Sequence, residues 1–426
     1  MEKIIKPVKR ITGEITVPGD KSISHRAIMI GSIACGTTKV KGIARSDDCD
    51  HTMNAFKAMG IGIKKDGALT IIKGKGLNGL SRPLGPVNTG NSGTTMRMLP
   101  GILGGQDFEA TLTGDKGLLK RPMKRIVEPL CRMGIDIEAH KGGYPPLKIR
   151  GGAVKPIIYR MPIPSAQVKS AILFAGLYSK GETRVVEKFK SRDHTERMLY
   201  HFGADIKCGA KAVSIKGGRE LAARSLEIPG DISSASFFIQ AAVIIKGSRV
   251  KIKNVSINQT RAGILDVLVR MGAKVRVINK KKGFEPVGDI IAESSRTRGI
   301  TIDSSMIPAI IDELPVIFVL AALSRGRTVI KGAGELRVKE TDRISSMGYN
   351  LKRMGALFSV KGDNIIIDGV DKLAGARLDS FDDHRTCMAM AIAALAADGE
   401  SMIKRTETVS KSFPGFFKSL DNLITR

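Results

Sequence analysis

The pattern of apolar and polar positions is repeated six times along the chain. In each copy a mostly apolar, helix-like run ends at a glycine, and a strand rich in β-branched residues follows. The six glycines lie 66 to 79 residues apart, so the copies account for nearly the whole chain. The copies span residues 22–42, 94–114, 167–186, 232–255, 312–332 and 383–405, with glycines at Gly36, Gly104, Gly181, Gly247, Gly326 and Gly399.

An amphipathic segment that ends in Met-Gly or Phe-Gly follows each of the first five copies. A glycine at this place is typical of the left-handed residue that ends a helix. Each copy is therefore predicted to form helix, strand, helix, strand, with extra short strands near the lysine- and glycine-rich turns, and the sixth is truncated after a helix-like segment at 416–423. The pairs are Met59-Gly60, Met133-Gly134, Phe202-Gly203, Met271-Gly272 and Met354-Gly355.

Six copies of this kind predict an α/β protein with two similar domains of three copies each. A chain of 426 residues also exceeds what one hydrophobic core commonly supports. The first strand, expected at 3–17, has no partner in the first copy and could complete the sixth. We therefore expect one domain at 19–230 and another made of 1–18 with 231–426, with a double-crossover hinge near Gly19 and Gly230.

Composition narrows the class of protein. Apolar residues make up 42% of the chain, and no window is apolar enough for a membrane span. The N-terminus alternates charged and apolar residues and lacks the apolar region of a signal peptide. The five cysteines are scattered and form no C-x-x-C pair, which argues against disulfides and zinc sites. We expect a cytoplasmic protein with no metal.

The formal net charge of +28 has three interpretations. It could serve nucleic-acid binding, but aromatic residues are only 4% of the chain and no block of five or six like charges is present. It could focus small, highly anionic substrates into a cleft. It could also reflect a lysine-rich solvated surface.

Cations at predicted helix starts favour anionic ligands. Ser, Thr, Asn and Asp at such positions are ordinary N-caps, but capping does not explain Lys21, Arg26 or Arg385. A cation in the first turn opposes the helix dipole unless an anion lies between it and the free N–H groups. The second helices also begin near cations, namely Arg45, Arg121, Arg192, Arg261, Lys339 and Lys411.

Two carboxylates among these cations are candidates for proton transfer. Asp312 follows an apolar run and heads an apolar helix, and Glu340 lies beside Lys339. A carboxylate close to cations has a lowered pKa and can act as a base. Asp312 could equally be a simple helix cap.

Four motifs, in order along the chain, closely resemble the EPSP (5-enolpyruvylshikimate-3-phosphate) synthase family, in its second bacterial and archaeal class. They are Pro-Gly-Asp-Lys-Ser-Ile-Ser-His-Arg at 18–26, Gly-Asn-Ser-Gly-Thr-Thr-Met-Arg at 90–97, Leu-Arg-Val-Lys-Glu-Thr-Asp-Arg at 336–343 and Asp-His-Arg at 383–385. The resemblance implies two domains of three βαβαββ repeats each, with pseudo-threefold symmetry. It implies transfer of the enolpyruvyl group of phosphoenolpyruvate to the 5-hydroxyl of shikimate 3-phosphate, without metal or organic cofactor. It also implies a cytoplasmic monomer that binds neither nucleic acid nor membrane.

The resemblance also implies roles for individual residues. Asp312 would accept the proton of the 5-hydroxyl, and Lys21 and Glu340 are both candidates to protonate the methylene carbon. The residues implied to bind shikimate 3-phosphate are Lys21, Ser22, Arg26, Ser165, Ala166, Gln167, Ser191, Arg192, Asp312 and Lys339. Those implied to bind phosphoenolpyruvate are Lys21, Asn91, Gly93, Arg121, Gln167, Arg343, Arg385 and Lys411.

The chain departs from the enterobacterial pattern at three positions, Ala166, Glu335 and Asp382, where Ser, Asn and Asn are common. Two rivals remain. A related enolpyruvyl transferase that acts on a UDP-linked amino sugar carries a cysteine before the equivalent of Arg121, and the loop 114–120 has none. An RNA-binding or RNA-end-processing protein is favoured only by the net charge.

Overall fold

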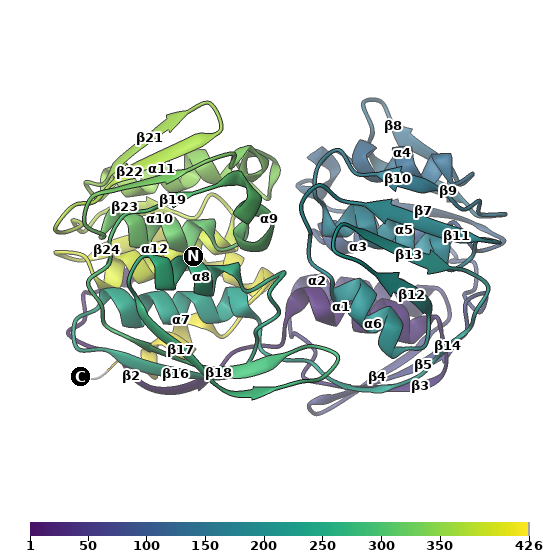
Figure 1. The fold of residues 1–426 in the computed structure, drawn as a ribbon, viewed down its shortest axis with the longest axis horizontal. Helices are drawn as coiled ribbons and strands as arrows, with labels where there is room; N and C mark the ends of the chain where they lie inside the picture. Colours follow the sequence, from purple (N-terminus) through teal and green to yellow (C-terminus); the bar gives the residue numbers. More distant parts are fainter. Residues whose placement is uncertain (425–426) are drawn as a thin grey trace. The chain divides into compact units, whose positions relative to one another are not determined.

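The computed structural model describes residues 1–424, which form two compact units (Figure 1). Unit 2 is Gly19–Ile228, and unit 1 combines Met1–Pro18 with Pro229–Arg426. Each unit contains three sheets within the described residues. The sheets share one plan, in which a leading strand runs parallel to a second strand and the second pairs antiparallel with the next.

The sheets of unit 2 follow this plan in the three copies of its repeat. The first sheet places β14 (Leu221–Ala222) and β15 (Ser225–Glu227) beside β3 (Ala34–Lys41), then β5 (Leu69–Lys75) and β4 (Gly62–Asp66). The second sheet is β6 (Val87–Asn88), β7 (Glu109–Thr113), β9 (Tyr144–Arg150) and β8 (Asp136–His140). The third sheet is β10 (Ile158–Arg160), β11 (Glu182–Val186), β13 (Ala212–Lys216) and β12 (Asp205–Cys208).

The helices of unit 2 divide into an inner and an outer set. The inner helices are buried along most of their lengths because they are apolar or small on nearly every side, and they are α1 (Lys21–Ser32), α3 (Gly93–Leu103) and α5 (Ala166–Gly176). The outer helices are α2 (Asp47–Ala58), α4 (Lys124–Arg132) and α6 (His194–His201), with a short 3-10 helix η1 (Leu118–Lys120). The inner helices therefore supply the core, and their first turns carry the polar motifs.

Unit 1 repeats the same sheet plan. Its sheets are β2 (Thr12–Thr16), β16 (Arg249–Ser256), β18 (Val287–Glu293) and β17 (Lys274–Lys281); β19 (Thr301–Ile302), β20 (Arg327–Ile330), β22 (Asn364–Asp368) and β21 (Leu357–Lys361); and β23 (Arg377–Asp379), β24 (Ser401–Lys404) and β1 (Glu2–Ile5). The inner helices are α7 (Ile232–Ile244), α10 (Leu314–Ala322) and α12 (His384–Leu395). The others are α8 (Gly263–Arg270), α9 (Ile307–Ile310), α11 (Arg343–Arg353) and α13 (Phe416–Asp421), with η2 (Ser304–Met306), η3 (Gly334–Val338) and η4 (Thr406–Lys411).

The expected single strand at 3–17 is wrong in its extent, because this segment forms two strands in two sheets. β1 pairs antiparallel with β24, with Lys3 opposite Ile403, and so completes the truncated sixth copy as expected. β2 pairs parallel with β16, with Ile15 opposite Ile252. Pro7 lies between the two strands, and proline has no N–H to donate to a sheet.

The leading strands of the first and fourth copies are exchanged along the chain. β2 directly precedes α1 of unit 2 but pairs in unit 1 with β16. β15 directly precedes α7 of unit 1 but pairs in unit 2 with β3, where Leu226 lies opposite Val40. Two connections therefore join the units, one at each of these strand ends.

The glycines of the Met-Gly and Phe-Gly pairs adopt the predicted left-handed conformation. All five have φ between +83° and +90°, at Gly60, Gly134, Gly203, Gly272 and Gly355. The six glycines that end the first helix of each copy are less uniform, because the backbone of Gly104 is in the right-handed helical conformation with φ −59°. A Cβ at Gly104 would lie 2.2 Å from Ile135 Cδ1, so packing requires glycine there.

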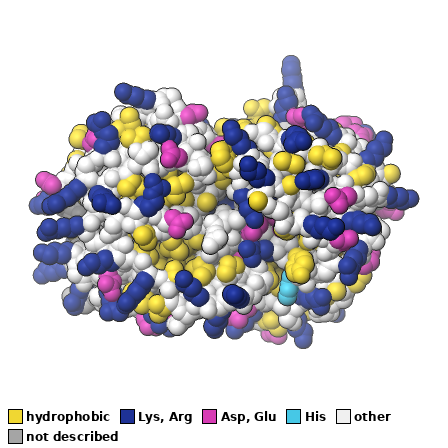
Figure 2. Space-filling view, viewed as in Figure 1, with side chains coloured by type: hydrophobic (Ala, Val, Ile, Leu, Met, Phe, Trp, Pro, Cys, Tyr) yellow, Lys and Arg dark blue, Asp and Glu magenta, His cyan; other side chains and the backbone are white. Residues whose placement is uncertain are grey.

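Two properties of the whole chain follow from these elements. No single helix among residues 1–424 is long and apolar enough to span a membrane, and one helix pair, Ser304–Ile310 with Leu314–Ala322, passes that test only together, with a bend of 114°. Figure 2 shows Lys and Arg side chains scattered over the visible face rather than gathered in one stripe. This spread favours the interpretation of much of the net charge as a solvated surface.

Candidate functional site

The first turns of the inner helices of unit 2 are capped by side chains from the predicted motifs. Asp20 accepts a hydrogen bond from Ile23 N at 2.9 Å, Ser92 one from Thr95 N at 3.2 Å, and Ser165 one from Val168 N at 3.4 Å. Capping is therefore part of what these motifs do. The cations beside the caps have a different set of partners.

Lys21, at the start of α1, is held by a carboxylate of the same unit. Its Nζ donates to Asp48 Oδ2 at 2.8 Å, and about 15% of each side chain remains exposed. Asp48 was not predicted from the sequence, because it looks like one of several ordinary acidic residues in the first turn of α2. An ammonium fixed in this way can meet an anion or deliver a proton from a defined position.

A buried polar chain fixes α1, α2 and α3 to one another near Lys21. His25 Nδ1 lies 2.6 Å from Thr52 Oγ1, Thr52 Oγ1 lies 2.7 Å from Thr95 Oγ1, and Thr95 Oγ1 lies 2.7 Å from Ser92 Oγ. Burial lowers the pKa of His25 to about 3, so its ring is neutral at physiological pH. These hydrogen bonds thus hold the starts of α1 and α3 together without adding charge.

Gly93 lets a guanidinium approach the start of α3. A Cβ at this position would lie 2.8 Å from Arg121 Nη1, so the guanidinium would have to move away from the helix start. Gln167 is oriented across the same region, since it accepts from Arg97 Nη1 at 3.0 Å and donates to Thr94 Oγ1 at 3.1 Å. The structure therefore brings together Gly93, Arg121 and Gln167, three residues that the resemblance assigns to phosphoenolpyruvate. Asn91 bonds to Asp115 at 2.8 Å.

Arg26 connects the starts of α1, α5 and α6. It donates to Thr195 Oγ1 at 2.6 Å, to Ser170 Oγ at 2.9 Å and to the carbonyl of Ser22 at 2.8 Å. Arg26 therefore links the start of α1, through Ser22, to the start of α5, because Ser170 in turn donates to the carbonyl of Ala166. Ser170 and Thr195 were missed by sequence reasoning, because buried hydroxyls leave no periodic signal.

A buried ion triad fixes the segment that carries Ser191 and Arg192. Lys169 Nζ lies 2.7 Å from both Glu187 Oε2 and Glu196 Oε1, and the three side chains are at most 6% exposed. Lys169 also donates to Ser191 O at 3.2 Å, while Ser191 N donates to Glu187 Oε1 at 3.1 Å. Burial raises the pKa of Glu196, although Lys169 opposes this. The backbone of Ser191 is therefore held from both sides.

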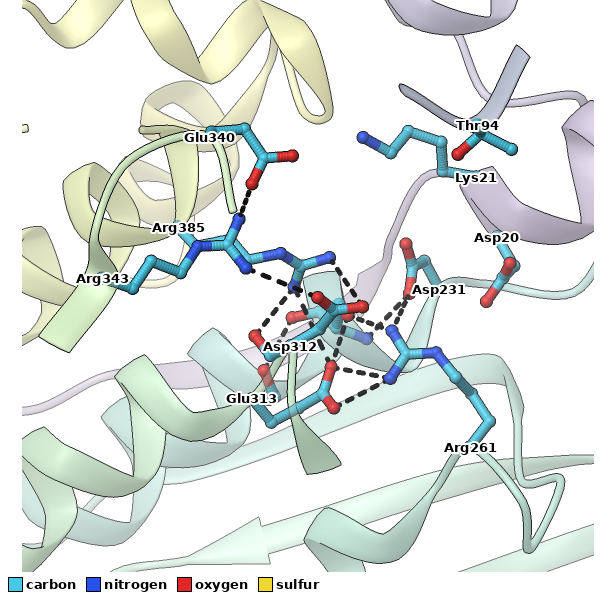
Figure 3. A network of polar contacts seen from close by, with 12 residues as sticks. Asp20, Lys21, Thr94, Asp231, Arg261, Asp312, Glu313, Glu340, Arg343 and Arg385 are labelled. Carbon is cyan, nitrogen blue, oxygen red and sulfur yellow. Dashed lines mark hydrogen bonds and ion pairs between the residues drawn. The ribbon is translucent and has the colours of Figure 1, made fainter. Parts of the chain in front are cut away.

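In unit 1, Arg343 is the centre of a carboxylate cluster (Figure 3). It donates to Asp383 Oδ2 at 2.7 Å and to Glu340, and its Nη1 lies 3.4 Å from Asp312 Oδ1. Burial opposes its charge, but these three carboxylates raise the pKa of Arg343, which stays protonated. Asp383 thus helps to position Arg343, a role that the sequence did not indicate.

Asp312 and Arg385 lie together in the same cluster. Arg385 Nη1 donates to the main-chain oxygen of Asp312 at 3.0 Å, and its Nη2 lies 3.7 Å from Asp312 Oδ2. Asp312 is not the N-cap of α10, since Glu313 occupies that position and no side chain caps the helix. The capping alternative for Asp312 is therefore wrong, and its carboxylate faces two arginines.

Lys411 and Lys339 add cations from η4 and from the residue after η3. Lys411 Nζ and Thr408 Oγ1 both donate to the carbonyl of Asp382 at 2.9 Å. Phe381 and Asp382 have φ of +51° and +58°, an uncommon conformation for residues other than glycine. Desolvation lowers the pKa of Lys339 to about 8, although Asp312 opposes the shift.

Within each unit, the structure gathers the cations and carboxylates of several helix starts. Unit 2 gathers Lys21, Ser22, Arg26, Gly93, Arg121, the residues 165–167 and Ser191, and unit 1 gathers Asp312, Lys339, Glu340, Arg343, Arg385 and Lys411. Among residues 1–424, no group of three or more His, Cys, Asp or Glu side chains is arranged to hold a metal ion. Each collection instead suits small anions such as phosphates and carboxylates.

Comparison with known proteins gives a consistent result over the full chain. Residues 5–420 match the family model described as EPSP synthase (3-phosphoshikimate 1-carboxyvinyltransferase). A 3-phosphoshikimate 1-carboxyvinyltransferase of Geobacter metallireducens is 50% identical over 424 residues, which cover 99% of both chains. One of Bacillus cytotoxicus is 48% identical over 98% of this chain and 99% of its own.

Solved structures show the same fold. The EPSP synthase of Acinetobacter baumannii superimposes with a TM-score of 0.89 at 43% identity, covering 100% of this chain and 98% of its own. The enolpyruvyl transferase NikO from Streptomyces tendae gives a TM-score of 0.80 at 18% identity over 99% of this chain and 96% of its own. This second likeness concerns the fold alone. The expected α/β enolpyruvyl transferase fold is therefore confirmed.

Proposed function

The chain belongs to the EPSP synthase family of 3-phosphoshikimate 1-carboxyvinyltransferases, and from this premise we propose how it works. It transfers the enolpyruvyl group of phosphoenolpyruvate to the 5-hydroxyl of shikimate 3-phosphate and releases phosphate. This reaction belongs to the shikimate pathway, which leads to chorismate and the aromatic amino acids. The five cysteines are all free thiols, which fits a cytoplasmic enzyme, and we propose that it acts as a monomer.

The observation that most supports these residue roles is the Asp312–Arg343–Arg385 cluster of unit 1. Arg343 and Arg385 present guanidinium groups suited to the phosphate or carboxylate of phosphoenolpyruvate. Asp312 lies between them, 3.4 Å and 3.7 Å away, and can accept the proton of the attacking 5-hydroxyl. Fixed cations beside a base suit a reaction in which two anionic reactants are held together.

The reaction needs one proton delivered to the methylene carbon as the 5-hydroxyl oxygen attacks the adjacent carbon. Lys21, held by Asp48, and Glu340, held by Arg343, are the two candidates to deliver it. The tetrahedral intermediate then expels phosphate when a proton leaves the new methyl group. The cations neutralise both anionic groups of the intermediate during this sequence.

We propose further that the residues of unit 2 bind the phosphate of shikimate 3-phosphate. Arg26 is fixed by three hydrogen bonds and Ser191 by the Lys169 triad, so both are oriented before any ligand arrives. Residues of both units then act on the same pair of substrates. We propose that the two connections near Gly19 and Gly230 act as a hinge for this purpose.

One assay tests the proposed activity. Phosphate release is measured after mixing the protein with both substrates, and again with each substrate omitted in turn. We expect release only when phosphoenolpyruvate and shikimate 3-phosphate are both present. Release with a UDP-linked amino sugar in place of shikimate 3-phosphate would overturn the proposal in favour of the related transferase. Binding to RNA that weakens steeply with salt would instead support the second rival.

The lowered pKa of Lys339 predicts that kcat/KM for shikimate 3-phosphate falls at basic pH. Its pKa of about 8 means that the ammonium deprotonates as the pH rises through that value, and a charge-assisted bond to shikimate 3-phosphate is then lost. Such a bond contributes about 1.5–3 kcal/mol, so kcat/KM for this substrate should fall by about tenfold or more. Initial rates between about pH 6.5 and 9.5 measure the effect, since kcat/KM reports ionisations of the free enzyme. The Lys339→Arg variant stays charged, and an equally steep limb in it would assign the ionisation elsewhere.

A further inference from the structure

We propose that Arg261 and Glu313 form a positioning pair for Asp312. They fix the start of α10 so that the neighbouring carboxylate is presented between Arg343 and Arg385. Neither residue belongs to the set that the family resemblance assigns to the substrates. The proposal rests on the proposed function, because Asp312 takes its role as base from it.

The pair is buried, and its polar contacts come from several elements (Figure 3). Arg261 Nη1 lies 2.8 Å from both carboxylate oxygens of Glu313, and the two side chains are 2% and 0% exposed. Ser233 Oγ donates to Glu313 and accepts from Arg261 Nη2. Asp231, the N-cap of α7, lies 3.5 Å from Arg261 Nη2. Arg261 therefore joins the starts of α7, α8 and α10.

The contacts of Glu313 reach Asp312 through the peptide bond that the two residues share. Glu313 N donates to Ile310 O at 2.8 Å, and its carbonyl accepts from Ile317 N at 3.0 Å as the first bond of α10. Its side chain is held by Arg261 and Ser233, while the carbonyl of Asp312 is held by Arg385 at 3.0 Å. The backbone at Asp312 is thus restrained from both sides, and this sets the direction of its carboxylate.

Stability alone does not account for a charged pair at this place. A buried ion pair has a large desolvation cost, and apolar side chains of similar size often stabilise a fold as well or better. Leu314 directly follows Glu313 in the chain and Ile264 lies three residues after Arg261, and both are fully buried in the hydrophobic core. An apolar pair, however, would not fix the orientation of the start of α10. Hydrogen bonds from a planar guanidinium specify both the position and the rotation of the carboxylate that they hold.

The electrostatic effect agrees with this role. Glu313 neutralises Arg261 inside the cluster, since it accepts from both that guanidinium and Ser233. Arg385 Nη1 is also 3.9 Å from Glu313 Oε1, so the pair helps to orient one of the two cations that face Asp312. Asp312 then faces Arg343 and Arg385, the groups proposed to bind phosphoenolpyruvate, and it also interacts with the charge of Lys339.

A double variant separates positioning from stability. Arg261→Met and Glu313→Leu are each expected to lower the urea midpoint, because each leaves one buried charge without its partner. The combined variant is expected to regain most of the midpoint because both charges are gone. Its kcat should nevertheless remain at least tenfold below that of the parent, with KM for both substrates within about twofold. Arg327→Met, which removes one partner of an exposed ion pair with Asp368, is the matched control and should leave kcat and both KM values unchanged.

A double variant with the parental midpoint and the parental kcat would overturn the proposal, because the pair would then serve only stability. If the double variant does not fold, Glu313→Gln decides, since it keeps the shape and an acceptor oxygen. A lowered kcat with unchanged KM values in that variant supports positioning, and a parental kcat contradicts it. Failure of the proposed function is distinguishable, because the parent itself would then release no phosphate from the two substrates.

Discussion

Replacing Asp312 with asparagine will lower kcat by roughly a hundred- to ten-thousandfold, which is the usual contribution of a general base. Asparagine keeps the size of the side chain but cannot accept the proton of the 5-hydroxyl. Arg343 and Arg385 lie 3.4 Å and 3.7 Å from this carboxylate. Removing its charge leaves both guanidinium groups more available to an anion, so KM for phosphoenolpyruvate should not rise.

Steady-state rates give both parameters, and calorimetry shows whether shikimate 3-phosphate still binds to the variant. The Asp312→Ala variant is a useful companion, because it should also retain substrate binding and lose most turnover. Turnover close to that of the parent in either variant would rule out Asp312 as the base. A loss of binding without a change in kcat would assign Asp312 to the shikimate ring alone.

Replacing Arg385 with alanine will raise KM for phosphoenolpyruvate by about 10- to 150-fold, as expected for loss of a charge-assisted hydrogen bond worth about 1.5–3 kcal/mol. Arg385 lies at the start of α12 and is less than 10% exposed. Arg385→Lys should recover only part of the loss, because lysine keeps the charge without the planar fork. KM for shikimate 3-phosphate should change little.

Initial rates at varied phosphoenolpyruvate and saturating shikimate 3-phosphate measure this effect. Arg327→Ala serves as the control, since it removes an exposed arginine of the same unit that pairs with Asp368. If Arg385→Ala shows the same KM for phosphoenolpyruvate as the control, Arg385 does not bind that substrate. A common loss of stability in both variants would appear in the urea midpoint rather than in KM.

Much of the local structure could be predicted because it depends on residues close in sequence. The Met-Gly and Phe-Gly pairs end helices in the left-handed conformation as expected, because glycine alone adopts it at little cost. The cations at helix starts were visible for the same reason, since Lys21 and Arg385 lie in the first turns of α1 and α12 and oppose the helix dipole there. The proposed roles of Ser191 and Arg192, in contrast, come only from the family resemblance.

The partners that fix the charged residues in place could not be predicted from local sequence patterns. Asp48 looks like one of several first-turn acids of α2, and only the fold brings it 2.8 Å from Lys21. Glu313 looks like the neighbour of a candidate base, and only the fold buries it against Arg261. In each case the partners lie 27 or 52 residues apart in the chain, so no periodicity links them.

By itself, the sequence determined the sixfold repetition, the alternation of helix and strand within each copy and the charged helix starts, because hydrophobic period and capping act over a few residues. Only the tertiary structure decided that residues 2–16 form two strands, with β1 beside β24 and β2 beside β16. Only the tertiary structure gathered Asp312, Arg343, Arg385 and the Arg261–Glu313 pair. Strand partners and buried ion pairs are selected by the packing of distant segments, and that selection leaves no local pattern in the chain.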